Sequence, residues 1–305
     1  MEHRDTSAAA GALRDRLLAQ PGFPADLALL DGFVRAASVY GPLDDYKIYS
    51  PAAREIAARL RSEHGEAATR MFLRAAIAHA VVTSLAGPIY AALPARIKLQ
   101  QLRQFGRMVA DTDPGVEWLS FEHDLFRKEF GLATVRLYAA GARLIDPRCG
   151  IQRSMLLRGA PRDWLRCAHT LGMAGGFKPY FQTHIHTFML EGFTAEATEE
   201  LYRCCADLYA LHPEALGSFA ASWFYDPAVA RVSPRLAYLR EIPESGGART
   251  LFVSAGKDAI GNALSKSANR RRLHEAGEYQ PKVYMLVWPK KRQQAWARAN
   301  PGGAA

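Results

Sequence analysis

Short apolar runs alternate with amphipathic helical stretches over residues 217–289, and this alternation constrains the fold more than any other feature of the chain. The strand-like runs are residues 218–225 (SFAASWFY), 249–254 (RTLFVS) and 283–288 (VYMLVW). Helical periods separate them at residues 234–240 and 265–276. Such alternation is typical of a sheet covered by helices. It predicts an α/β layer in the C-terminal half.

The N-terminal third has a different pattern, in which Ala, Leu and Arg recur at helical spacing. Ser50 followed by Pro51 is typical of a helix start, because a capping hydroxyl precedes a proline at the first helical position. We expect an α+β chain with a helical region at 1–112, a mixed α/β domain at 113–290 and a basic tail at 291–305. The predicted helices span residues 8–19, 24–37, 51–64, 67–83 and 97–110.

Further strands and a helix are predicted between the two parts. Residues 134–137 and 142–145 flank an Ala-Ala-Gly turn, which indicates a β-hairpin. Residues 177–189 (FKPYFQTHIHTFM) alternate and are rich in aromatic residues and Thr, which favours a strand. Thr194 is a suitable cap for a helix at 195–211.

The resulting order is hairpin, strand, helix, strand, helix, strand, helix, strand. It resembles the GNAT acyltransferase superfamily over residues 121–290. The resemblance implies a mixed sheet that splays open between the strands at 177–189 and 218–225, with an acyl thioester of coenzyme A in the opening. The glycine loop of that superfamily is missing, since residues 190–194 (LEGFT) hold one glycine and no basic residue. The identity of the cofactor is therefore left open, with acyl-coenzyme A as one possibility.

A second resemblance lies in the strings SWFYDP, SPRLAYL, RRRLHEAGEYQPK and YMLVWP. They are similar to those of a family of uncharacterised bacterial proteins. That resemblance supports one evolutionary unit over residues 120–290 and implies no reaction.

The positive charge is concentrated near the C-terminus. The chain has a formal net charge of +9, and residues 257–305 carry ten Lys or Arg against three acids, which is +7 of that total. No zinc-finger, RNP or helix-turn-helix signature accompanies these residues. We therefore expect a small-molecule substrate, or an acidic partner, rather than nucleic acid.

The chain has the composition of a cytoplasmic protein. Its N-terminus lacks a secretory signal, and its most apolar stretch is interrupted by Arg74, His79 and Pro88, which excludes a membrane span there. The four cysteines form no CxxC pair, so we expect them to be reduced and structural. The oligomeric state stays open.

His184 and His186 are the leading candidates for catalysis. They lie two positions apart on the predicted strand, so both imidazoles should project from one face. One of them could serve as a general base near neutral pH, or the pair could hold a metal together with Glu191 or Asp226. A structural role on the polar face of the strand is the third interpretation. Asp226 is a further catalytic candidate, because it ends a strand where ligands bind α/β sheets, and an Asx turn is its alternative.

Binding residues are predicted around the same strand ends. Trp223 and Tyr225 are candidates for an aromatic substrate wall. Arg235 and Arg240 are candidates for a substrate carboxylate. Arg270 and Arg271 are candidates for an anionic cofactor, with a solvated helix face as the alternative.

Three functions follow from these residues. The first is an acyltransferase-like enzyme that acts on a small amino-containing metabolite with a histidine as general base. The second is a metal-dependent or cofactor-free enzyme of specialised metabolism that uses the histidine pair. The third is a non-catalytic binding or regulatory protein with a basic docking surface.

Overall fold

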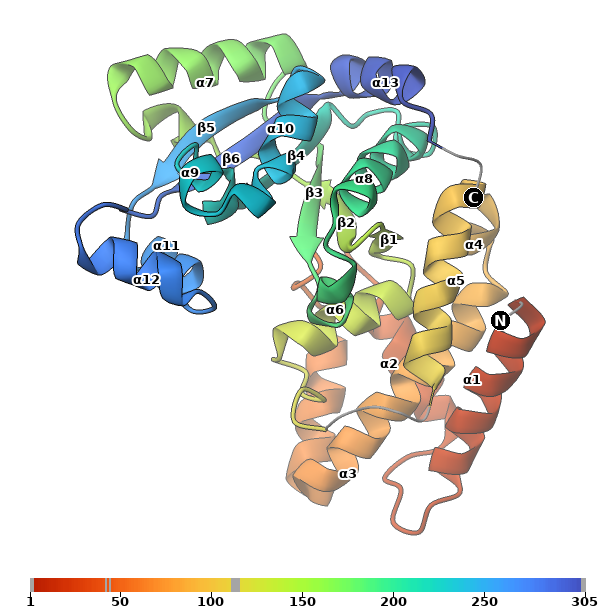
Figure 1. The fold of residues 1–305 in the computed structure, drawn as a ribbon. Coiled ribbons are helices and arrows are strands. Elements are labelled where there is room, and N and C mark those ends of the chain that lie inside the picture. The colour runs from red at the N-terminus through yellow and green to blue at the C-terminus, as the bar shows by residue number, and fades with distance from the viewer. Residues whose placement is uncertain (1–2, 42, 44, 111–115, 303–305) are drawn as a thin grey trace. The chain divides into compact units, whose positions relative to one another are not determined.

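The computed structural model describes residues 3–41, 43, 45–110 and 116–302. The chain forms two compact units (Figure 1). Unit 1 comprises Met1–Asp146 and Ile185–Leu190, and unit 2 comprises Pro147–His184 and Glu191–Ala305. The boundary predicted between residues 112 and 113 lies outside the described residues.

Unit 1 is built mainly from helices, as the sequence predicts. The two helices expected at 51–64 and 67–83 run on as α3, which bends at Gly65, where φ is +78° and glycine is favoured. Ser50 caps α3 as expected, because its Oγ accepts the Ala53 N–H at 3.3 Å. The helices are α1 (His3–Leu18), α2 (Leu27–Ala37), α3 (Pro51–Leu85), α4 (Pro88–Ala92), α5 (Ala95–Val109) and α6 (Asp124–Ala133), of which α4 and α6 were not predicted.

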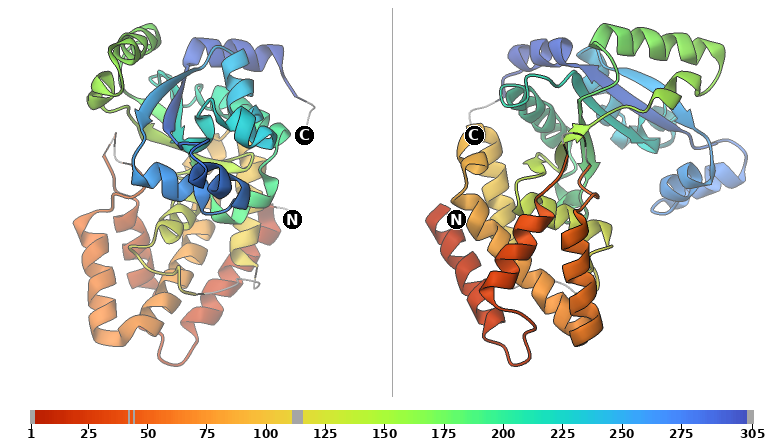
Figure 2. Two further views of the ribbon diagram at one scale, coloured as in Figure 1. Left: turned by 60° about the vertical axis from the view of Figure 1, so that its left-hand side comes forward. Right: turned by 180° about the vertical axis from the view of Figure 1, so that it is seen from behind.

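The core of unit 1 is aromatic. Helices α1, α2 and α6 each pack against α3, and the red-to-yellow helices lie side by side in both views of Figure 2. Phe33 on α2 is fully buried and meets Phe72, Phe121 and Phe130 edge to face, with ring centroids 5.2–5.9 Å apart. Such contacts bury large apolar surfaces in specific geometry.

The predicted hairpin is present, with its strands displaced toward the C-terminus. Strand β1 (Tyr138–Ala140) pairs antiparallel with β2 (Arg143–Cys149), and Ala140 lies opposite Arg143. The strand expected at 134–137 is wrong, because Thr134 caps the C-terminal end of α6 and its hydroxyl donates to the Phe130 carbonyl.

One mixed sheet has the strand order β1-β2-β3-β4-β6-β5. Strands β5 (Arg249–Ser254) and β6 (Val283–Pro289) confirm the prediction closely. Strands β3 (Tyr180–Ile185) and β4 (Gly217–Ser222) are shorter than expected, since 3-10 turns η2 (Thr187–Gly192) and η3 (Trp223–Tyr225) follow them. Pairs β4–β6 and β5–β6 are antiparallel, whereas β3–β4 is parallel.

Two layers of helices cover the sheet of unit 2. On one face Cys167 and Leu171 of α7 (Pro161–Ala174) join a core with Met285 and Val287 of β6. On the other, Trp288 meets Tyr202 of α8 (Ala195–Leu208) and Trp296 of α13 (Lys290–Ala299). Figure 1 shows α7 and α10 on opposite sides of the sheet. Alternate side chains of one strand therefore serve both layers.

The remaining elements of unit 2 correct three predictions. In place of the helix expected at 234–240, a 3-10 turn is followed by a helix that continues to Ser245. The helix expected at 265–276 is present, and another helix, Lys257–Leu264, precedes it. The basic tail is largely helix α13, whose Gln293 is fully buried. These elements are η1 (Arg153–Leu157), α9 (Val229–Val232), η4 (Pro234–Leu236), α10 (Tyr238–Ser245), α11 (Lys257–Leu264) and α12 (Ala268–Glu275). Across the described residues, no helix has the length and apolar character needed to cross a membrane.

Candidate functional site

The parallel pair β3–β4 in unit 2 is joined over only part of its length. Phe181 lies opposite Ser218 and Gln182 opposite Phe219, and along these two described strands no further residue pair forms. Strand β4 nevertheless stays paired with β6 as far as Ser222. The C-terminal halves of β3 and β4 are therefore not paired with each other.

His184 lies on the half of β3 that extends beyond its pairing with β4. Its side chain is half-buried, and one of its ring nitrogens lies within 4.8 Å of Cys149 Sγ, at the end of β2. Next to it, the Thr183 hydroxyl is buried without a hydrogen-bond partner in the described structure. A half-buried imidazole can accept a proton from a bound substrate.

His186 does not share a strand face with His184, because β3 ends at Ile185. The expectation that both imidazoles project from one strand face is therefore wrong. His186 belongs to unit 1, where it is fully buried and its Nε2 lies 2.7 Å from Glu129 Oε1 on α6. Its Nδ1 accepts the Phe188 N–H at 3.2 Å.

Arg107 of α5 completes this buried cluster. Its Nη2 lies 2.5 Å from the same Glu129 oxygen, and its guanidinium stacks on the Phe188 ring at 4.9 Å. Burial acts to raise the pKa of Glu129, but the hydrogen bond from His186 and the charge of Arg107 outweigh it, so the pKa is lowered. The carboxylate is thus held ionised, and it ties His186 into the core rather than exposing it to a substrate.

Asp226 is held by backbone groups, as the Asx-turn alternative expects. Its Oδ1 accepts the Ala228 N–H at 3.0 Å and its Oδ2 accepts the Lys282 N–H at 3.2 Å, just before β6. The residue is 4% exposed, and this burial raises the pKa of its carboxyl group despite the two hydrogen bonds. Asp226 therefore stabilises the loop around it through these two backbone hydrogen bonds.

Arg270 and Trp223 come together, although they were predicted for different ligands. The buried Arg270 guanidinium stacks on the Trp223 ring at 4.4 Å, and it donates to the Ala263 carbonyl and the Ser233 hydroxyl. Arg271 donates to the carbonyls of residues 264 and 265. Both arginines therefore bind the C-terminal end of α11, where helix carbonyls lack helical partners.

The other predicted binding residues are dispersed. Arg235 is exposed, and Arg240 forms an ion pair with Glu244 at 3.3 Å on its own helix. Tyr225 is fully buried. These positions do not yet define a substrate pocket.

The N-terminus of α8 follows β3, where the GNAT superfamily binds the cofactor diphosphate. Here Thr194 Oγ1 accepts the Ala197 N–H at 3.2 Å. The carboxylate of Glu196 accepts hydrogen bonds from the Glu196 backbone N–H and from the Thr194 side chain, and these lower the pKa of Glu196. The helix end is thus occupied by its own side chains and carries an exposed acid. It does not fit a diphosphate.

The sequence reasoning missed Glu129 and Arg107. The signal was present on α6, where Glu129 falls between Phe126 and Ala133 at helical spacing. An acid on the apolar stripe of a helix indicates a buried partner. The identity of that partner depends on a contact between residues far apart in the chain.

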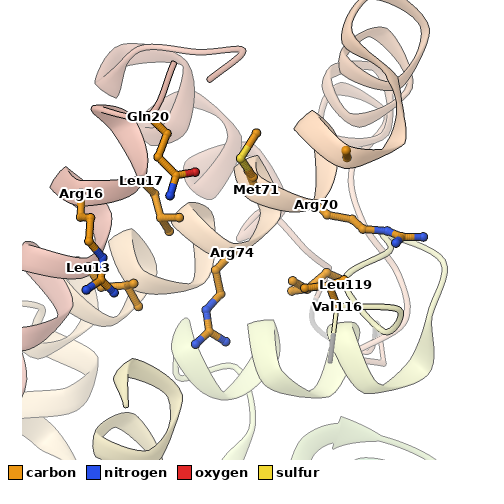
Figure 3. A pocket seen from close by; sticks show the side chains of 10 residues that line it. Leu13, Arg16, Leu17, Gln20, Arg70, Met71, Arg74, Val116 and Leu119 are labelled. Carbon is orange, nitrogen blue, oxygen red and sulfur yellow. The ribbon is translucent and has the colours of Figure 1, made fainter. Parts of the chain in front are cut away.

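Unit 1 contains two hollows of about 660 Å³ each. One lies between α1 and α3 and has three arginines among apolar residues. Figure 3 shows Arg70 extending away from Arg16 and Arg74. Its described lining is Leu13, Arg16, Leu17, Gln20, Ala67, Arg70, Met71, Arg74, Val116 and Leu119.

Comparisons with family models, with curated proteins and with solved structures were made for the whole chain. None of the three finds a match.

Proposed function

We propose that unit 2 is a GNAT-like acyltransferase that transfers an acyl group from a thioester to a small amine. The observation that carries this proposal is the parallel pair β3–β4, which is joined over two residue pairs and then separates. The other strand pairs of unit 2 support it, because β4 continues into the antiparallel strands β6 and β5. A strand edge without a partner offers backbone N–H and C=O groups to an extended ligand.

His184 is the general base of this proposal, because it is the predicted histidine that lies on β3 beyond the residues paired with β4. It takes a proton from the acceptor amine while the amine nitrogen attacks the thioester carbonyl carbon. The C–N bond forms and the C–S bond breaks, so an amide and a thiolate result, and the thiolate takes up a proton. Backbone N–H groups at the strand edge can stabilise the oxyanion that develops on the carbonyl oxygen.

The proposed donor is a thioester. If this thioester carries a diphosphate, the N-terminus of α8 does not bind it. The exposed Glu196 and the self-capped helix end support this choice. We therefore expect an acyl N-acetylcysteamine thioester, which lacks the nucleotide of coenzyme A, to react with a kcat/KM within about tenfold of acyl-coenzyme A. A much larger preference for acyl-coenzyme A would show that a diphosphate site was overlooked.

The test measures thiol release and amide formation with a panel of amines and acyl thioesters. His184→Gln should lower kcat about 100-fold or more, since general base catalysis contributes on that order. His169→Gln, an exposed histidine on α7, is the matched control and should leave the rate unchanged. Equal rates for His184→Gln and the unmodified protein would contradict the assignment of the base. Absence of thioester binding and turnover across the panel would contradict the proposed function.

A further inference from the structure

The second hollow of unit 1 combines a basic rim with an aromatic floor. It lies between the first half of α3 and the start of α6, and its volume is about 660 Å³. That volume is in the range of small-molecule sites, roughly 300–1,000 Å³. Its described lining is Lys47, Tyr49, Arg54, Ala57, Ala58, Arg61, Ser62, Thr69, Phe121, Glu122 and Arg127.

The charge of this lining is strongly positive. Four of the described lining side chains are cationic, and Glu122 is the one carboxylate among them. Glu122 is already neutralised, because Arg61 lies 3.0 Å away and the Ser120 hydroxyl donates to it at 2.9 Å. Arg61 also meets Glu66 at 3.1 Å, so two acids share its charge, and Lys47 lies 3.7 Å from Asp124.

Arg54 and Arg127 are the unbalanced cations. Within the part of the chain that the structure describes, the Arg54 side chain has neither a hydrogen bond nor an ion pair. Arg127 uses its Nε to donate to the Phe121 carbonyl at 3.1 Å, and no described carboxylate lies within 4 Å of its guanidinium. Two guanidinium groups that line one hollow, neither of them with a described carboxylate partner, favour an anion with several oxygens.

Two aromatic residues line the hollow together with these cations. The rings of Tyr49 and Phe121 have centroids 4.6 Å apart and an interplanar angle of 39°, and both residues are at least nine-tenths buried. Ala57 lies beside them in the first segment of α3. Only a small part of each ring can meet a ligand, and an edge-to-face contact with an aromatic ring is favourable.

We propose that this hollow binds a phosphorylated small molecule with an aromatic body. The phosphate is held by Arg54 and Arg127, and the ring rests on Tyr49 and Phe121. The site lies wholly within unit 1, so the proposal stands whether or not unit 2 is an acyltransferase. The hollow of Figure 3 is the weaker candidate, because its Arg16 and Arg74 already have interaction partners.

The test is calorimetric titration of the full chain with phenyl phosphate, inorganic phosphate and phenol. Phenyl phosphate should bind saturably and more tightly than inorganic phosphate, and phenol should not bind. Arg54→Gln should raise the Kd for phenyl phosphate about tenfold or more, as loss of a charge-assisted contact does. Arg54 is exposed and makes no side-chain contact that the fold needs, so this variant should keep the wild-type melting temperature.

Arg59→Gln is the matched control, because Arg59 is exposed on the same helix and does not line the hollow. Its Kd should equal that of the unmodified protein. Three results would overturn the proposal: no saturable binding of phenyl phosphate, an unchanged Kd in Arg54→Gln, or an equal rise in Arg59→Gln. The last would show that the general positive field attracts the anion.

Discussion

At the scale of single residues, the buried cluster of Glu129, His186 and Arg107 has the largest energetic consequence. One carboxylate oxygen contacts both neighbours, at 2.7 Å from His186 Nε2 and 2.5 Å from Arg107 Nη2. Removing one member of a buried ion pair is strongly destabilising, because the remaining charge stays buried without compensation. The cluster therefore explains why a histidine predicted for catalysis is instead a structural residue of unit 1.

Glu129→Gln should lower the free energy of unfolding by about 3 kcal/mol at neutral pH. Because the folded-state pKa of Glu129 lies below its ordinary value of 4.5, its contribution is fully present above about pH 4.5. That contribution is lost as the pH falls through the folded-state pKa. Urea denaturation between pH 3 and pH 7 should therefore show a flatter acid limb in the variant.

The control for this prediction is Glu55→Gln on α3, which is exposed and has no side-chain partner among the described residues. Its unfolding free energy should change by less than about 0.5 kcal/mol. If Glu129→Gln behaved like this control, the carboxylate would not be the ionised centre of the cluster.

At the scale of elements, the sheet of unit 2 depends on close backbone approach at Gly217. A Cβ atom at this position would lie 2.3 Å from the Trp288 carbonyl oxygen of the paired strand β6. Gly217→Ala should therefore push β4 from β6 and destabilise the protein by about 2 kcal/mol or more. Gly261→Ala, in α11, is the matched comparison, since nothing lies within 4 Å of its Cβ.

Gly261→Ala should instead stabilise the protein by about 0.5–1 kcal/mol, because alanine has the higher helix propensity. Thermal denaturation of both variants checks the pair of predictions. If both variants were destabilised equally, the loss of glycine itself, and not the contact with the Trp288 carbonyl, would account for the decrease in stability.

Elements with a local signal could be predicted from the sequence, and the others could not. Ser50 and Thr194 mark the starts of α3 and α8, and the bounds predicted for β5 agree with those observed. Strand β3 was predicted too long, because the alternating pattern continues through residues 186–189 where no neighbouring strand pairs with it. A strand's length depends on such long-range pairing, which periodicity does not record. In the same way, His184 was found from its own spacing, whereas Glu129 needed knowledge of its distant partner.

At the scale of the whole molecule, the chain passes between the two units three times. It leaves unit 1 after Asp146, returns at Ile185 and leaves again after Leu190. The returning segment carries His186 to Glu129 and Phe188 to Arg107 and Trp118. Unit 1 is therefore incomplete in any fragment that ends where the sheet unit begins.

This connection predicts how fragments of the protein behave. Residues 1–146 alone should unfold at a lower temperature than the same residues joined to 185–190 by a flexible Gly/Ser linker. The linked segment restores the His186 contact of the buried Glu129 carboxylate, which keeps its Arg107 contact in both fragments, and a hydrogen bond to a charged group should contribute about 2 kcal/mol. The same linked fragment with His186→Ala should lose most of that gain while it keeps the Phe188 contacts.

Circular dichroism melting curves of the three fragments separate these effects. If the linked and unlinked fragments melted together, the segment 185–190 would contribute nothing to the stability of unit 1, and the buried ion pair would not hold this part of the chain.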